Sequence, residues 1–137
     1  MANKPFAYYL EEIIKGIEQR KSVDYSSKES VQRYNAIYDR IIKCARHIDI
    51  HYPNQIEVLM KLLYHEDFDV VVHCAPIILT LSNSSIAQKW EAVDVIRRFL
   101  VDSRLSKSNR RAFTINLESW ETRLKEMTDS ETNGRIW

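Results

Sequence analysis

The stretch that decides the fold runs from residue 66 to residue 100 and reads EDFDVVVHCAPIILTLSNSSIAQKWEAVDVIRRFL. It alternates an acidic turn, an almost wholly apolar segment, a polar turn and an amphipathic segment. The segment from Asp69 to Leu81 is apolar on nearly every side, which is typical of a helix in the middle of a domain. Asp69 is a preferred N-cap type, and residues 83–85 supply the next turn and cap. We therefore expect two consecutive helices joined by a short turn.

Helical patterns precede this stretch. Pro5 suits the first position of a helix whose apolar stripe ends near Lys21. Ser26 and Glu29 form a capping box for a long second helix, which ends before Pro53 because the residue before proline disfavours helix. A shorter third helix follows, and its apolar positions are Ile56, Leu59, Met60, Leu62 and Leu63.

Helical patterns also follow it. The fifth helix turns Trp90, Val93, Ile96, Phe99 and Leu100 inward, and Ser106 or Ser108 caps a sixth helix that runs to Met127. We expect one domain over residues 1–127 and a loose polar tail over residues 128–137, with an unusual Trp137 at its end. Six helices joined by short turns run alternately up and down, so the fold class is all-α, as a short α-solenoid of about six stacked antiparallel helices.

Particular residues carry a resemblance to a known family. HEAT-like repeats open their second helix with an aspartate, a valine, often an arginine, and then small residues and leucines. This pattern is matched by Asp69, Val70, Cys74, Ala75, Leu79 and Leu81, whereas Val71 stands in place of the arginine. The next helix looks like the first helix of a following repeat, through Ala87, Ala92, Val93, Ile96 and Leu100. The clear match covers about a quarter of the chain, which resembles the small single-domain HEAT-like proteins of bacteria.

Some proteins of that kind are immunity proteins of contact-dependent or other polymorphic toxin systems. The resemblance therefore implies a cytoplasmic binding protein that neutralises a cognate toxin, such as a nuclease, by occlusion, with no catalysis and no cofactor. The topology places turns one, three and five on one edge. We expect the toxin there, on an acidic side at Tyr64, Glu66, Asp67 and Asp69 and a basic side at Arg104, Arg110 and Arg111.

The basic cluster leaves an alternative open. It comprises Arg97, Arg98, Arg104, Lys107, Arg110 and Arg111. A HEAT-like nucleic-acid-binding domain would use these side chains to neutralise phosphates. The chain as a whole carries a net charge of only +1, which offers no general attraction to phosphate polymers or anionic lipid. The cluster also reads as a solvated turn that follows a helix end.

Metal and enzyme alternatives are weaker. Cys44, His47 and His51 share one side of the second helix, but Cys44 falls on its apolar stripe, so we interpret it as a packed cysteine between two surface histidines and expect no metal. No phosphate loop, nucleophile elbow or HExxH helix occurs, so an enzyme is not expected. With only two cysteines and neither an apolar leader nor a membrane-length run, the cytoplasm is the expected compartment.

Overall fold

The structure is a computed structural model that describes residues 4–21 and 27–134. The described chain is helical and contains no strand, so the fold is all-α. Its elements are α1 (Phe6–Lys21), α2 (Lys28–His51), η1 (Pro53–Gln55), α3 (Ile56–Met60), η2 (Lys61–Tyr64), α4 (Phe68–Thr80), α5 (Ile86–Leu100) and α6 (Lys107–Gly134). None of these helices is long and apolar enough to cross a membrane.

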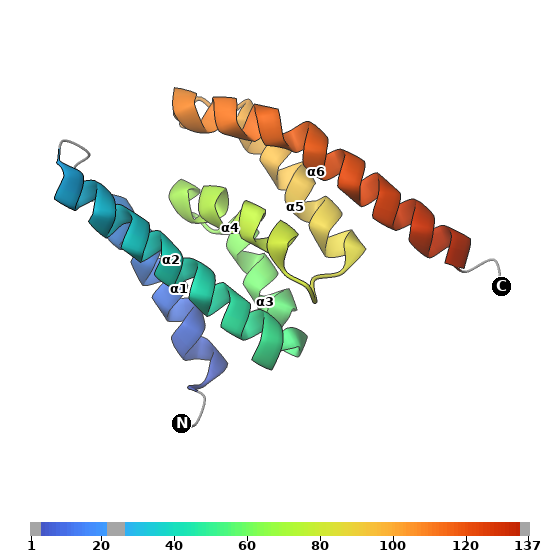
Figure 1. The fold of residues 1–137 in the computed structure, drawn as a ribbon, viewed down its shortest axis with the longest axis horizontal. Coiled ribbons are helices and arrows are strands. Elements are labelled where there is room, and N and C mark those ends of the chain that lie inside the picture. The colour runs from blue at the N-terminus through green and yellow to red at the C-terminus, as the bar shows by residue number, and fades with distance from the viewer. Residues whose placement is uncertain (1–3, 22–26, 135–137) are drawn as a thin grey trace.

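Successive helices pack against one another in three groups. Helices α1 and α2 pair at one end of the molecule, α5 and α6 pair at the other, and α3 and α4 lie between them (Figure 1). Helix α4 contacts both α1 and α5 and contributes six buried residues, Val70, Val72, Cys74, Ala75, Ile77 and Ile78. The prediction that this apolar helix lies in the middle of the domain is therefore confirmed.

Two predicted caps are wrong by one or two positions. The N-cap of α4 is Asp67, whose Oδ1 accepts a hydrogen bond from the backbone N–H of Asp69 at 3.0 Å, so Asp69 lies inside the first turn. The N-cap of α2 is Ser27, which accepts from the N–H of Ser30. Ser26 lies outside the described residues. In both cases a nearby residue of the same type is the N-cap. Sequence spacing alone does not decide which of two nearby aspartates or serines caps the helix.

The end of the sixth helix is also corrected. Ser106 accepts from the N–H of Asn109 at the start of α6, as one of the two predicted caps. Helix α6 then continues beyond Met127 to Gly134, where the sequence predicts a loose tail. The indole N–H of Trp90 on α5 donates to the Thr128 hydroxyl at 3.1 Å, which fastens the first residue of this extension. Trp137 lies outside the described residues.

Gly16 sets the spacing between α1 and α2. A Cβ at this position would stand 2.7 Å from Cγ1 of the buried Ile41, well inside normal contact distance. We expect Gly16→Ala to lower the free energy of unfolding by about 1–2 kcal/mol, because overpacking outweighs the gain in helix propensity. In an Ile41→Ala background the same change should stabilise the protein instead. Urea unfolding of the four proteins measures both effects, and equal effects in both backgrounds would show that the contact with Ile41 plays no part.

Candidate functional site

A hollow lies where η2 and the start of α4 meet the end of α5. Its volume is about 230 Å³, and its lining residues are Leu63, Tyr64, His65, Glu66, Phe68, Val71, Val95, Arg98, Phe99, Asp102 and Arg104. Leu63, Val95 and Phe99 are buried side chains of the core, so the floor is apolar. Tyr64, Glu66, Arg98 and Arg104 are exposed. The hollow therefore combines an apolar floor with an aromatic and charged rim.

Two arginines of the rim lie over aromatic rings. The guanidinium carbon of Arg98 is 5.7 Å from the ring centroid of Tyr64, and that of Arg104 is 4.2 Å from the ring centroid of Phe68. Both distances are within the range of a cation–π interaction. The two contacts place both cations beside exposed or half-buried aromatic surface.

The charge of Arg104 is already matched within the chain. Its Nε and Nη2 donate to the two carboxylate oxygens of Asp102, at 3.0 and 2.7 Å. This bidentate contact lowers the pKa of Asp102 to about 2. Arg98 and Glu66 differ from this pair, because neither forms an ion pair or a side-chain hydrogen bond with any described residue. The rim thus presents one cation and one anion that an external group can meet.

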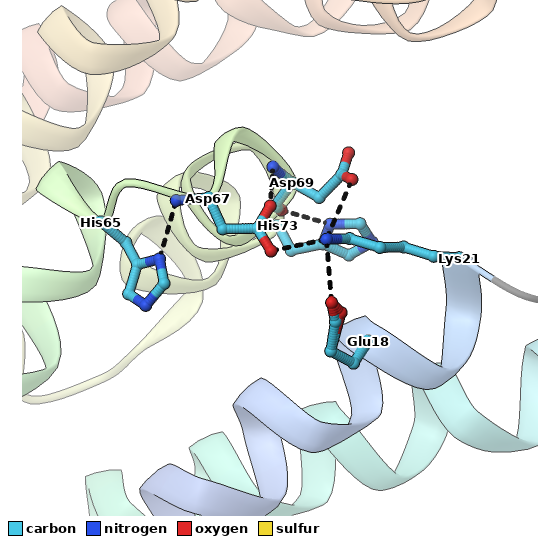
Figure 2. Close-up of polar contacts among 6 residues, drawn as sticks. All are labelled: Glu18, Lys21, His65, Asp67, Asp69 and His73. Atoms are coloured by element: carbon cyan, nitrogen blue, oxygen red, sulfur yellow. Dashed lines mark hydrogen bonds and ion pairs between the residues drawn. The ribbon is translucent and has the colours of Figure 1, made fainter.

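The acidic turn is fastened to α1 by one lysine. Figure 2 shows the ammonium group of Lys21 facing Asp67, Asp69 and Glu18, at 2.5, 3.6 and 3.1 Å. On the opposite side, Nδ1 of His65 accepts the backbone N–H of Asp67 at 2.9 Å. Asp67 therefore caps α4, pairs with Lys21 and donates its own backbone N–H to His65. This cluster holds the start of α4 against the end of α1.

The ion pair makes stability depend on pH. The side-chain hydrogen bond from Lys21 lowers the pKa of Asp67 below its ordinary 3.8. A lowered folded-state pKa adds stability that is present above the unfolded value and is lost as pH falls through the folded value. Asn also caps helices, so Asp67→Asn removes the charge and retains the cap. We expect the urea midpoint to fall more steeply for wild type than for Asp67→Asn as pH drops below about 4; parallel curves would contradict this.

Three of the seven predicted site residues line the hollow and four do not. Tyr64, Glu66 and Arg104 line the hollow together. Asp67 and Asp69 face Lys21 on α1 instead. The Arg110 guanidinium donates to the backbone carbonyls of Leu100, Asp102 and Leu105 and so caps the end of α5. Arg111 is exposed on α6 and does not line the hollow.

Several residues of the hollow were not among the predicted site residues. Phe68 and Arg98 each complete a cation–π contact with a predicted residue, and Val71 and Val95 line the apolar floor. Phe68 had a signal in the sequence, since it is an aromatic residue between two aspartates of a turn. Arg98 belongs to the basic cluster of the alternative prediction, but its contact with Tyr64 has no signal in the sequence, because the two residues lie on elements that are distant in the chain.

The histidine cluster on α2 differs from the prediction. His51 is exposed, as predicted, whereas His47 is half-buried: its ring stacks on Tyr9 of α1 at 4.1 Å between centroids, and its Nε2 is buried without a hydrogen-bond partner among the described residues. Desolvation and the neighbouring His51 lower the pKa of His47. Cys44 is half-buried. The part of the chain that the structure describes holds no group of three or more His, Cys, Asp or Glu placed to bind a metal.

Comparison of this chain with known protein families, with curated proteins and with solved structures finds no match.

Proposed function

We propose that this protein is a binding domain that acts as an immunity protein, neutralising a cognate bacterial toxin in the cytoplasm by covering its active site. The observation that carries the proposal is the hollow between η2, α4 and α5. It joins an apolar floor to exposed Tyr64, Arg98 and Arg104. Tyr and Arg are enriched where a few residues dominate the energy of a protein interface, and an apolar pocket ringed by polar groups is the usual setting.

The scaffold supports this role. We propose that the three groups of helices stack antiparallel as a short HEAT-like solenoid, in line with the sequence resemblance. Contacts of α1 with α2, of α4 with α5 and of α5 with α6 support this arrangement. Each such unit buries its apolar face only against the next, so the turns at the edges are held on a rigid support. A rigid edge binds with little loss of conformational entropy.

Electrostatics supports a toxin that acts on phosphate substrates. A nuclease binds phosphate with cations, and an inhibitor that covers such a site presents carboxylates to those cations. Glu66 is exposed on the rim and forms no ion pair with the described residues. Its charge is therefore available to a basic partner. Asp67 supports the fold and not the contact, since Lys21 already neutralises it.

Charge reversal at Glu66 tests the surface. We expect Glu66→Lys to slow association with the toxin about 3–10-fold at low salt, because complementary charge acts mainly on the association rate. The helical circular dichroism should not change, since Glu66 makes no structural contact. Glu11→Lys is the matched control, an exposed residue on α1 away from the hollow. Equal association rates for wild type and Glu66→Lys would remove this residue from the interface.

The alternative, a nucleic-acid-binding domain, has less support. Of the six residues in the basic cluster, Arg97 pairs with Asp94 and Glu121, Arg104 pairs with Asp102, and Arg110 donates to backbone carbonyls. These partners occupy three of the six groups that would otherwise neutralise phosphates. Duplex affinity that falls steeply from low to physiological salt would favour this alternative over the toxin.

A further inference from the structure

We propose that the hollow receives one apolar side chain of the partner, flanked by a carboxylate that pairs with Arg98. The inference rests on the proposed function only in taking this surface as a protein-binding site. It adds the chemistry of the partner segment and names Arg98 as the residue that selects it.

The size of the hollow indicates a single anchor. Its volume of about 230 Å³ lies below the range of about 300–1,000 Å³ that is typical of sites for whole small molecules. One side chain of a protein partner fits this space better than a cofactor. The floor is apolar, with Val95 and Phe99 buried beneath the opening. We therefore infer an apolar anchor, because a polar group placed against Leu63, Val95 and Phe99 would lose its water without gaining a hydrogen-bond partner from them.

The charges beside the hollow indicate a carboxylate next to that anchor. Asp102 already accepts hydrogen bonds from Nε and Nη2 of Arg104 and neutralises its charge, so Arg104 attracts a further carboxylate less than Arg98 does. Arg98 forms no ion pair with a described residue, and the Tyr64 ring holds it at the rim. A guanidinium accepts a carboxylate through two parallel hydrogen bonds. Because Arg98 is held in place by the ring, it loses little freedom when it binds.

Glu66 on the same rim does not change this assignment. It carries the opposite charge and is suited to a basic group elsewhere on the partner. Among the described residues that line the hollow, only Arg98 has both an unmatched charge and a cation–π contact, which it makes with Tyr64. The partner segment therefore carries an acidic residue beside an apolar one.

Three capped dipeptides test the inference without knowledge of the toxin: acetyl-aspartyl-phenylalanine amide and its asparaginyl and lysyl counterparts. Each is titrated into the full chain, and the backbone amide signals of residues 63–71 and 95–104 are followed by NMR. We expect the aspartyl peptide to bind about threefold more tightly than the asparaginyl one at low salt, which is the size of one exposed ion pair. High salt should remove the difference in affinity between the aspartyl and asparaginyl peptides.

Arg98→Gln is expected to abolish the preference for the aspartyl peptide and to preserve the helical circular dichroism. Arg111→Gln, which alters an exposed arginine outside the hollow, should leave the preference intact. Equal affinity for the three peptides, no binding by any of them up to about 10 mM, or a preference that survives Arg98→Gln would each overturn the inference. Toxin neutralisation that persists in such a case would show that the proposed function stands and that only the anchor is wrong.

Discussion

Replacement of Lys89 by Met is expected to lower the free energy of unfolding by about 2–4 kcal/mol. Lys89 lies on α5 and is 8% exposed, and its ammonium group donates to the carbonyls of Leu81 and Ser84 and to the Ser84 hydroxyl, at 2.7, 2.9 and 2.5 Å. A methionine fills similar space but donates nothing. The carbonyls of Leu81 and Ser84, in the turn between α4 and α5, would then lose this donor.

Urea unfolding measures the loss as a shift of the midpoint at constant slope. Lys125→Met is the matched control, since Lys125 is an exposed residue on α6 and a surface change of this kind is worth less than about 0.5 kcal/mol. A Lys89→Met variant no less stable than this control would show that water replaces the three hydrogen bonds at no cost.

Asp49→Ala is expected to lower the free energy of unfolding by about 2 kcal/mol. The change removes the carboxylate that binds the turn between α4 and α5 from the side of α2. The Asp49 carboxylate on α2 accepts the backbone N–H groups of Ser82 and Asn83, both at 2.8 Å. Its own backbone carbonyl accepts from the Asn83 amide at 2.8 Å. Lys89 therefore satisfies acceptors of the turn while Asp49 satisfies its donors.

The same unfolding measurement with Asp39→Ala, an exposed position on α2, provides the comparison. A cost at Asp49 as small as at Asp39 would contradict the role assigned to these two N–H groups. The result bears on function as well, because this turn joins α4 to α5 and the hollow lies between the other ends of those two helices. A loosened turn should therefore also weaken binding at the hollow.

The helices were largely predictable from the sequence because each carries a local signal. Periodic apolar residues, Pro5 before α1, Pro53 after α2 and the predicted cap over residues 83–85, which Ser85 provides, all act within a few residues. Boundaries were less predictable where two capping residues lie close together, as at Asp67 and Asp69. The extension of α6 depends on the contact between Trp90 and Thr128, which no local pattern reveals.

The candidate site was predictable only in part, for the same reason. The topology argument pointed to Tyr64, Glu66 and Arg104, which do line one hollow. It did not separate the outward-facing carboxylate of Glu66 from those of Asp67 and Asp69. Lys21 of α1 pairs with both of these aspartates. Nor did it show that Arg110 donates to backbone carbonyls at the end of α5. These choices depend on which side chains meet across helices, so only the three-dimensional arrangement reveals them.

The central claim is tested most directly by the growth of cells that produce the product of the gene next to this protein's gene, which we expect to be a toxin that arrests growth. The protein is expected to restore growth when it is produced in the same cells and to co-purify with that product as a stable complex. Arg98→Glu combined with Tyr64→Ala should weaken both effects, because the two residues form one contact at the rim of the hollow. Growth that stays arrested with the protein present, together with no complex on gel filtration, would contradict the account.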